Sequence, residues 1–528
     1  MELSVLITSA AYVENELVAE FGKLPPAFLP ISNRRLFTLQ AKVLSGLGGK
    51  IYLSLPDSFV IDAHDLDLLR DSRIETIHVP DGLSLASSIS YSIDIIRPQG
   101  QMCILHGDTV VNEMTAITSD VISVSADVPE YDWAHYKMNR SGLVEEISQS
   151  SLDDREQYSG ILSGFFSIMH VSDFQEMLKD TLDFVAALDV YTKKYPFQVL
   201  DTSRWLDLGH LQTYYRSRAT LTTERAFNSL SMDNHHIFKT SADSRKMEAE
   251  FLWFQSLPEP LRVYSPRSVY EETRDGQVGY HISYEYLLPL SDVYVFGRLS
   301  SREWDGIFES LKTMLSEFRL HSAPDASPVS NDFYKLKTWQ RLETYSANTG
   351  FDLHKSIKFN GKYVPSLAAI AEELILVLDG AIPLQKSLTH GDLCFSNILF
   401  DFRSRKPVVI DPRGYFEEGP TLMGDYRYDL AKLSHSVIGL YDYIVAGYYE
   451  IDSKHTHDIK FRLPENIQVS SIQNAFSSVG VFPEEREAEI DAIMILLFVS
   501  MLPLHSDSRD RVSAFIANVA RLWQLKFE

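Results

Sequence analysis

Four polar residues in the second half of the chain have the types and the spacing that phosphoryl transfer requires. His390, Asp392 and Asn397 fall on one short segment, and the apolar run Val408–Ile410 leads directly into Asp411. Such a site needs an Asp that accepts the proton of the attacking hydroxyl, and an Asn and a second Asp that hold Mg²⁺ against the phosphates. The order Asp, Asn, strand, Asp brings these groups together on one loop and at the end of the next strand. The pattern predicts transfer of a phosphoryl group to a hydroxyl.

A structural alternative exists for the same residues. Gly391 and Asp392 would then form a turn that joins two strands, with Asn397 as a further turn residue. The protein-kinase signature H-R-D-x-x-x-x-N has the same spacing, with Gly391 here in place of its Arg. A turn accounts for one Asp but not for the whole set, and we therefore favour the catalytic interpretation.

Length and charge narrow the class of protein. A chain of 528 residues is expected to form two or three domains. Its 49 Lys and Arg against 72 Asp and Glu give a net charge of -23, which argues against a nucleic-acid partner or an anionic membrane. We expect the partners to be small molecules.

Cysteine content and apolar segments indicate the compartment. The two cysteines, Cys103 and Cys394, form neither a disulfide framework nor a zinc cluster by their spacing. Met1–Ile7 lacks the basic start of a signal peptide, and the apolar run Ala492–Leu502 is too short to cross a bilayer. We expect a cytoplasmic protein without membrane insertion.

The first 218 residues alternate short apolar strands with helical patterns. Such alternation predicts βαβ units, and so an α/β domain with a mostly parallel sheet and helices on both faces. The predicted strands are Leu3–Ile7, Ile51–Leu55, Ile77–Val79 and Met102–Leu105.

The pattern changes near Arg218, where we place the boundary between the two halves. Short predicted strands around His236–Phe238 and His281–Tyr286 flank a helical stretch at Arg245–Ser256. Beyond Ser301 the pattern is mainly helical. We expect residues 1–218 to form one domain, 219–300 a small lobe with a sheet, and 301–528 a larger helical lobe.

With its motif of His390, Asp392, Asn397 and Asp411, the second half resembles the aminoglycoside phosphotransferase and choline kinase family, over roughly residues 220 to 520. The resemblance implies a bilobal α+β fold like that of protein kinases, with ATP and Mg²⁺ as cofactors. It makes Asp392 the catalytic base, Asn397 and Asp411 the Mg²⁺ ligands, and His390 a support for the loop. The segment Gly424–Leu433 resembles the family's G-D-x-x-Y-D-L-A motif, which packs behind that loop. Its Asp425 is either a helix N-cap, a loop anchor, or both.

The small lobe supplies candidates for nucleotide binding. Lys239 ends a predicted strand and is our candidate for the lysine on the α- and β-phosphates, with Glu250 as its first-choice partner and Glu248 as the second. A solvated surface pair is the alternative. Phe227–Ser229 would lie in the phosphate-covering loop, although no glycine-rich motif is present. Glu285 and Tyr286 resemble the hinge whose backbone binds adenine; the aromatic residues there would otherwise be core packing.

The acceptor site is less readable, because acceptor pockets in this family come from variable helices. Met501–Asp507 is an apolar helix end that turns into a polar cluster, where the family often builds its pocket. A helix cap or a solvated group is the alternative for its His505. The sequence leaves the acceptor open.

The first half resembles the sugar-phosphate nucleotidyltransferases, through four segments in the expected order: Leu24–Leu36, Ile104–Thr109, Ser159–Gly164 and Trp205–Gly209. The resemblance implies a Rossmann-like, GT-A-like fold in which Asp108 and Asp207 bind Mg²⁺. Two hard carboxylates on separate strand ends would clamp the metal against a nucleoside triphosphate (CTP, UTP or GTP) and a sugar phosphate.

One segment departs from that family. The loop after its first strand is normally rich in glycine and carries an Arg, so that backbone N–H groups wrap the triphosphate. Here Thr8–Glu16 has no glycine, no Arg and two carboxylates, and Pro26 stands where a lysine is usual. Lys23, Arg34 or Arg35 would compensate only in part. Nucleotidyl transfer and binding without transfer both stay open.

The two resemblances together predict a bifunctional activating enzyme. Its second half would phosphorylate a small alcohol or sugar, and its first half would transfer a nucleotide to that phosphate, for surface polysaccharide (the capsular type) or lipid head-group synthesis. The alternatives are a kinase with a degenerate, non-catalytic first domain, and a nucleotide-binding pseudo-enzyme scaffold. The complete set of Asp392, Asn397 and Asp411 argues against the scaffold.

Overall fold

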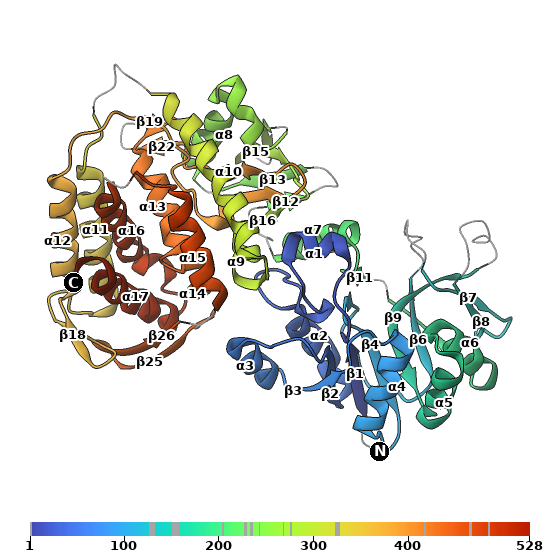
Figure 1. Ribbon diagram of the computed structural model, residues 1–528. Helices are drawn as coiled ribbons and strands as arrows, with labels where there is room; N and C mark the ends of the chain where they lie inside the picture. The colour runs from blue at the N-terminus through green and yellow to red at the C-terminus, as the bar shows by residue number, and fades with distance from the viewer. Residues whose placement is uncertain are drawn as a thin grey trace. The chain divides into compact units, whose positions relative to one another are not determined.

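The computed structural model describes residues 3–125, 133–149, 158–202, 205–225, 230–232, 236–241, 243–267, 269–274, 277–322, 328–416, 419–463, 467–483 and 486–528. The chain forms two compact units (Figure 1). Unit 1 is Met1–Thr222 with Phe296–Arg298, and unit 2 is Thr223–Val295 with Leu299–Glu528. The first division lies inside the continuous helix α7 (Leu211–Arg225), a few residues beyond the Arg218 boundary proposed from composition.

Unit 1 is built on a twisted sheet whose main strand order is β10-β6-β9-β4-β1-β2-β3. The central neighbours β1, β2, β3 and β4 pair in parallel, and β9 pairs antiparallel with both β4 and β6. This topology confirms the predicted α/β class with a mostly parallel sheet. The strands are β1 (Ser4–Thr8), β2 (Lys50–Pro56), β3 (Ile74–Val79), β4 (Met102–His106), β5 (Thr109–Val110), β6 (Val121–Ser125), β7 (His135–Met138), β8 (Val144–Ser148), β9 (Gly160–Ile168), β10 (Gln198–Asp201) and β11 (Leu206–Asp207).

Three helices bury one face of this sheet: α4 (Leu85–Ile96), α5 (Val171–Thr181) and α6 (Phe184–Lys194). Their apolar residues form a continuous core with inward residues of β1, β4, β6 and β9, such as Leu6, Ile104 and Phe166. Apolar residues at helical spacing, as at Ile89 and Ile93, explain why these segments fold as amphipathic helices. Unit 1 also contains α1 (Asn15–Phe21), α2 (Leu36–Leu44), α3 (Ala63–Asp71) and most of α7.

A buried ion pair joins α2 to α3. The Arg35 guanidinium donates through Nε to Asp65 Oδ1 at 3.0 Å and through Nη2 to Asp65 Oδ2 at 2.8 Å. Both side chains are almost wholly buried, at 2% and 0% exposure. Nη1 donates further to the Phe28 carbonyl at 2.9 Å. Arg35 therefore joins the start of α2 to α3, and its compensation for charge in the Thr8–Glu16 loop stays a prediction.

Unit 2 begins with a small antiparallel sheet in the order β12-β13-β15-β14, packed against helix α8. The elements of this small lobe are β12 (Leu230–Met232), β13 (His236–Thr240), α8 (Ser244–Ser256), β14 (Val269–Arg274) and β15 (Gln277–Ser283). The strand predicted over His281–Tyr286 ends at Ser283, because the following residues leave the sheet to form the connection to β16.

The rest of unit 2 is a mainly helical lobe with short β-hairpins, which confirms the predicted combination of a small sheet and a large helical lobe. Its helices are α9 (Leu290–Phe296), α10 (Ser301–Leu320), α11 (Asp332–Thr349), α12 (Leu367–Asp379), α13 (Tyr426–Val437), α14 (Tyr441–Val445), α15 (Ile467–Val479), α16 (Glu487–Met501) and α17 (Arg509–Phe527). Its strands are β16 (Leu288–Pro289), β17 (Ile357–Phe359), β18 (Lys362–Val364), β19 (Ser387–Leu388), β20 (Ile398–Asp401), β21 (Lys406–Val409), β22 (Tyr415–Phe416), β23 (Gly419–Pro420), β24 (Met423–Gly424), β25 (Glu450–His455) and β26 (Asp458–Arg462).

Helix α16 is the central helix of this lobe. It packs against α11, α12, α13 and α17, and most of its side chains are buried. The stretch Glu487–His505 is long and apolar enough to span a membrane by length and composition, but 72% of its most apolar window is buried inside the protein. An apolar core helix passes the same test, and burial by four neighbouring helices favours that interpretation.

The buried pair of Arg35 and Asp65 yields a stability prediction. Asp65→Ala leaves the guanidinium buried without its carboxylate, and we expect a loss of roughly 3–5 kcal/mol in the free energy of unfolding. Asp67→Ala is the matched control on the same helix, because Asp67 is half-exposed and pairs only with the exposed Arg70. We expect it to cost less than about 1 kcal/mol. Chemical denaturation of the three proteins measures both changes, and equal stability of the two variants would contradict the role given to Asp65.

Candidate active sites

The small lobe of unit 2 holds a lysine between two carboxylates. Lys239 on β13 donates from Nζ to Glu250 Oε2 at 2.6 Å and to Asp411 Oδ1 at 3.0 Å. Glu250 lies on the buried face of α8, at 2% exposure, and also accepts the Tyr280 hydroxyl at 2.7 Å. Helical spacing decides between the two candidate partners, since Glu248 points outward and is exposed. The pKa of Lys239 is raised, because the two carboxylates outweigh the opposing effect of burial.

The predicted catalytic loop lies between β19 and β20. The β20–β21 hairpin that follows brings Asn397, at the end of this loop, close to Asp411. Strands β20 and β21 pair antiparallel, and the Ile410 N–H donates to the Asn397 carbonyl at 3.0 Å. This pairing sets Asn397 beside the strand end that carries Asp411. The Asn397 amide donates from Nδ2 to the Asp392 carboxylate at 3.1 Å and to its carbonyl at 2.9 Å. Three residues separated in sequence therefore converge, as the motif spacing indicated.

His390 supports this loop from inside the protein. Its Nδ1 accepts the Asp392 N–H at 3.3 Å, so that Nε2 carries the proton and donates to the Ile410 carbonyl at 3.0 Å. Burial lowers the pKa of His390 to about 4, which keeps the ring neutral. Its neighbour Gly391 has φ 79°, and a Cβ there would lie 2.7 Å from Cβ of Arg413. Only glycine fits this position, which explains why the kinase Arg is absent.

Helix α13 anchors the loop through Asp429, a residue to which the sequence analysis assigned no role. Asp429 accepts the N–H groups of His390 and Gly391, both at 2.7 Å. Asp425, the residue considered as cap or anchor, is the N-cap of α13 and accepts the Arg427 N–H at 2.9 Å. Burial raises the pKa of Asp429 to about 7, against the opposing effect of the two backbone donors.

Lys432, one turn beyond Asp429 on α13, is paired with the predicted base. Its Nζ lies 2.7 Å from Asp392 Oδ1, and the lysine is only 13% exposed. Burial by itself opposes ionisation of Asp392, but the Lys432 ammonium and its hydrogen bond prevail and lower the pKa of Asp392 to about 2. The carboxylate is thus ionised at neutral pH, with Lys432 on one oxygen and Asn397 on the other. The sequence reasoning did not identify Lys432.

Asp411 and Asn397 have the properties of Mg²⁺ ligands. Asp411 has φ 58°, a left-handed conformation that Asp tolerates better than most residues and that is common at functional sites. Its side chain is 41% exposed, which leaves room for phosphate and water oxygens. Asn397 uses its Nδ2 on Asp392, and its Oδ1, which accepts the Ser396 hydroxyl at 3.4 Å, has a second lone pair for a metal. These hard oxygen donors fit Mg²⁺, and their role stays a prediction.

The proposed hinge occupies 284–287, between β15 and β16. The Glu285 carboxylate accepts the Arg267 N–H at 2.9 Å and the Ser283 hydroxyl at 2.7 Å, and its carbonyl accepts the Leu287 N–H at 2.7 Å. The Glu285 side chain therefore holds the connection in shape, and Tyr286 is 46% exposed. Adenine binding by this segment stays a prediction. Phe227–Ser229 lies outside the described residues.

In unit 1, a short strand pair brings Asp108 and Asp207 together. Strand β11 pairs antiparallel with β5, with Asp207 opposite Thr109, and the Leu208 N–H donates to the Asp108 carbonyl at 2.8 Å. A Cβ on Gly209 would lie 2.4 Å from Asp108 Oδ2, so only glycine permits this approach. Burial, followed by the charge of Asp207, raises the pKa of Asp108 to about 6. Two carboxylates that repel each other in a buried place fit a divalent cation.

The surroundings of Asp207 fix its orientation. Its Oδ2 accepts the Thr213 hydroxyl and contacts His210 Nδ1 at 3.1 Å, and its Oδ1 accepts the Gly209 N–H at 3.3 Å. Within the described residues, no group of three or more His, Cys, Asp or Glu side chains forms a metal cluster. A shared metal on Asp108 and Asp207 stays a prediction.

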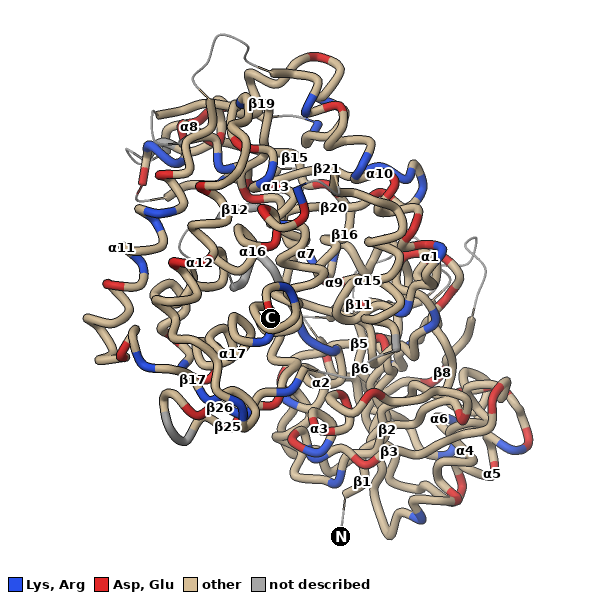
Figure 2. Tube along the Cα trace, turned by 60° about the vertical axis from the view of Figure 1, so that its left-hand side comes forward, with Lys and Arg blue, Asp and Glu red and all other residues tan. Residues whose placement is uncertain are grey.

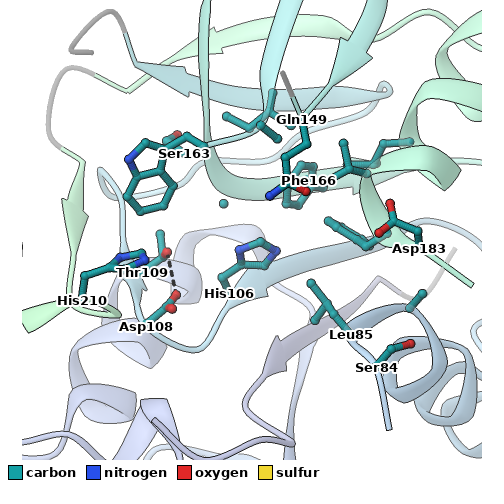
Figure 3. Close-up of a pocket in the computed structure, with 18 of the residues that line it drawn as sticks. Ser84, Leu85, His106, Asp108, Thr109, Gln149, Ser163, Phe166, Asp183 and His210 are labelled. Atoms are coloured by element: carbon teal, nitrogen blue, oxygen red, sulfur yellow. Dashed lines mark hydrogen bonds between the residues drawn. The ribbon is translucent and has the colours of Figure 1, made fainter. Parts of the chain in front are cut away.

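A pocket of about 350 Å³ opens beside Asp108. Figure 3 shows Asp108, Thr109 and His210 on one side of it and Leu85 and Asp183 on the other. Aromatic side chains add to its wall, with the Trp133 and Trp205 rings 5.0 Å apart. The lining residues include no Lys or Arg within the described chain. Among these lining residues His210 is the group whose pKa is raised, by its hydrogen bond to Asp207.

The loop between β1 and α1 contains neither a glycine nor a basic residue. Ser9 is bound on both sides, with its N–H donating to Ser54 Oγ and its Oγ accepting the Ala27 N–H, each at 3.0 Å. Glu14 is exposed, and its charge acts on His210. Lys23 is placed over the Tyr12 ring, with Nζ 4.1 Å from the centroid. Lys23 thus contacts this loop, and compensation of the loop's charge by the cations considered stays a prediction.

Comparison with known proteins agrees with this division. Residues 216–453 match the model of the phosphotransferase enzyme family, so unit 2 carries a phosphotransferase-family domain. No curated protein matches the chain.

Several solved structures are similar to part of the chain. A CTP:phosphocholine cytidylyltransferase from Streptococcus pneumoniae has 13% identity and a TM-score of 0.35, over 42% of this chain and 100% of that one. The inositol-1-phosphate CTP transferase from T. maritima has 14% identity and a TM-score of 0.35, over 42% and 96%. A nucleoside-diphosphate-sugar pyrophosphorylase from Vibrio cholerae RC9 has 9% identity and a TM-score of 0.34, over 41% and 99%. We base the fold of unit 1 on its strand order.

The metal role of Asp411 is testable by nucleotide binding. Asp411→Ala removes the carboxylate that is expected to hold Mg²⁺, and we expect the Mg·ATP affinity to fall at least about tenfold together with turnover. Asp401→Ala is the control, since Asp401 at the end of β20 bonds an exposed turn through Ser404 Oγ at 2.6 Å. Calorimetry with and without Mg²⁺ measures the change. Equal affinity of the wild type and Asp411→Ala would make Asp411 a strand-end residue only.

Proposed function

We propose that unit 2 is a small-molecule kinase that transfers the γ-phosphoryl group of ATP to an alcohol or sugar hydroxyl. The observation that carries this proposal is the set of contacts around Lys239, Glu250 and Asp411, which lie within hydrogen-bonding distance although they come from three separate segments. Protein kinases need this lysine–glutamate pair and a metal-binding Asp in place for phosphoryl transfer. The matched family model supports the same reaction class.

The residues divide the reaction between them. The hydroxyl oxygen attacks the γ-phosphorus, the bond from that phosphorus to the bridging oxygen breaks, and ADP leaves with the electron pair. Asp392, whose low pKa keeps it ionised at neutral pH, accepts the hydroxyl proton. Lys239 neutralises charge on the α- and β-phosphates, and Glu250 holds that lysine in position. Mg²⁺, bound by Asn397 and Asp411, would supply countercharge for the phosphates.

For unit 1 we propose nucleotidyl transfer to the phosphate made by unit 2. The approach of Asp108 to Asp207, next to a pocket of about 350 Å³, supports this second activity. The loop between β1 and α1 favours the alternative, in which unit 1 binds without catalysis, because exposed Glu14 repels a triphosphate. CTP, UTP or GTP would be the nucleotide. A bifunctional chain of this kind would make activated building blocks for surface polysaccharide or lipid head groups in the cytoplasm.

The kinase proposal is tested at Asp392. Asp392→Asn keeps the size of the side chain but cannot accept the proton, and we expect phosphoryl transfer to fall about 10²–10⁴-fold while ATP affinity is largely retained. The assay follows ADP release across sugars, glycerol, choline and ethanolamine. Near-normal turnover by this variant would contradict the assignment of Asp392 as the base.

The bifunctional proposal is tested at Asp108. Asp108→Ala should stop pyrophosphate release from CTP, UTP or GTP, because it removes one of the two carboxylates expected to hold the metal. Kinase turnover in the same sample is the internal control and should be unchanged. If the wild type releases no pyrophosphate from any of these nucleotides when given the phosphorylated product, unit 1 has no transferase activity and the binding-only alternative holds.

A further inference from the structure

Three cations gather around the predicted base of an otherwise acidic protein. Lys337 on α11 donates to the Tyr428 hydroxyl at 3.0 Å, and Arg413 Nη1 approaches the same hydroxyl at 3.5 Å. Lys432 lies on α13, one turn beyond Tyr428, and pairs with Asp392. The charges of Lys337 and Lys432 both act on Asp392. We call Lys337, Arg413 and Lys432, with Tyr428, the cation cluster.

Aromatic rings hold two members of the cluster in place. Nζ of Lys337 lies 5.4 Å from the centroids of both Phe333 and Tyr428, and Cζ of Arg413 lies 4.8 Å from the centroid of Phe333. Both cations are half-buried, so they have lost part of their hydration. Cation–π contacts replace some of that lost solvation without cancelling the positive charge.

Three carboxylates of the catalytic loop and of α13 already have partners within the described residues. Asp392 pairs with Lys432, and Asp425 pairs with Arg427 at 2.7 Å. Asp429 accepts the backbone N–H groups of the catalytic loop. Within the described part of the chain Lys337 has Tyr428 as its hydrogen-bond partner and no carboxylate partner. Acidic and basic residues are interspersed along the rest of the trace (Figure 2), so this local excess of positive charge departs from the net charge of -23.

The same three cations determine the pKa of Tyr428. Burial raises the pKa of its phenol, but the charges of Lys337, Lys432 and Arg413 outweigh burial and lower the pKa to about 8. A phenol that is 3% exposed would otherwise titrate above its ordinary value. An anion in this place would meet two charged donors and a phenol hydroxyl.

The elements that carry the cation cluster differ from the element that carries the candidate phosphate-binding lysine. Lys239, which comes from the small lobe, already faces Asp411 and serves as the candidate cation for the α- and β-phosphates. The cation cluster is built on α11, on α13 and on the segment after Asp411, which all belong to the large lobe that carries Asp392. The base must contact the acceptor hydroxyl, so a group beside the base contacts the acceptor.

We propose that the acceptor alcohol carries a second, anionic group, a phosphate or a carboxylate, which Lys337, Arg413 and Tyr428 bind while Asp392 meets the hydroxyl. This inference rests on the kinase function proposed for unit 2. It narrows the acceptor class to sugar phosphates, acidic sugars and hydroxy acids, and it excludes amino alcohols such as choline and ethanolamine, whose cationic group the cluster would repel.

The test compares acceptors of one skeleton that differ in charge, using the full chain. Two series serve: glycerol with glycerol 3-phosphate, glycerate and 2-amino-1,3-propanediol, and glucose with glucose 6-phosphate, glucuronate and glucosamine. We expect kcat/KM for an anionic member to exceed that of its neutral and amine-bearing counterparts at least about tenfold. The anionic member with the highest kcat/KM in each series shows whether the subsite prefers a phosphate or a carboxylate. Preference for a neutral or amine-bearing acceptor overturns the proposal.

Lys337→Met then locates the anionic group. We expect KM for the anionic acceptor to rise about 10- to 100-fold with the KM for ATP unchanged, since a hydrogen bond to a charged group is lost. Lys337→Arg keeps the charge and should retain most of the affinity. The control is Lys335→Met on the same helix, because Lys335 pairs with Asp379 at 2.7 Å away from the cluster. A uniform fall in kcat with every acceptor, or a rise in the KM for ATP, would assign the cluster to the transferred phosphoryl group and overturn the proposal.

A binding experiment covers the case in which no acceptor in either series is used. With a non-hydrolysable ATP analogue and Mg²⁺ present, inorganic phosphate and malonate are titrated into the wild type and into Lys337→Met. Saturable binding by the wild type that falls at least about tenfold in the variant supports the anion subsite, even if Asp392→Asn shows that the kinase function has failed. Absence of saturable binding of both anions to the wild type overturns the proposal.

Discussion

The ion pair between Lys239 and Asp411 is the interaction on which the candidate kinase site depends. It joins a strand of the small lobe to the end of β21 in the large lobe, with Nζ and Oδ1 3.0 Å apart. Glu250 holds the lysine from the other side, and being 2% exposed it needs that cation as countercharge. Removal of Lys239 would take the shared cation from both carboxylates, whereas removal of either carboxylate leaves Lys239 paired with the other. Lys239 and Asp411 thus connect the two lobes at the proposed phosphate site. Bound phosphates and a metal would replace this contact with new ones to the same two residues.

A second layer of structure keeps the base in position without touching substrate. Asp429 binds two successive N–H groups of the loop, and the neutral His390 spans from Asp392 to the Ile410 carbonyl. Two elements therefore fix the loop conformation: α13, through Asp429, and the segment that leads into Asp411, through the Ile410 carbonyl. Lys432 comes from the same helix, so one element both shapes the loop and sets the charge of its base.

Local patterns allowed prediction of much, but not all, of this arrangement. Asp392, Asn397 and Asp411 could be predicted from the sequence because one loop and one hairpin carry them. Strands β1 to β4 could be predicted because each is an apolar run between helical patterns. Helical periodicity alone separates Glu250 from Glu248. Lys432 and Lys337 could not be predicted from the sequence, because their importance comes from contacts with residues far away in the sequence. The antiparallel strand β9, inserted between β4 and β6, was missed for the same reason.

The close packing of Gly391 against Arg413 has a consequence for how relatives of this chain should be recognised. A Cβ at 391 would lie 2.7 Å from Cβ of Arg413, so a side chain at one position excludes the present backbone path at the other. The two short motifs, H-G-D at 390–392 and D-P-R-G at 411–414, therefore meet at this contact. A search pattern that requires both should separate chains with this loop geometry from protein kinases, in which an arginine occupies the position of Gly391. Because Gly391 also has φ 79°, a side chain there would be strained whatever residue stands at 413.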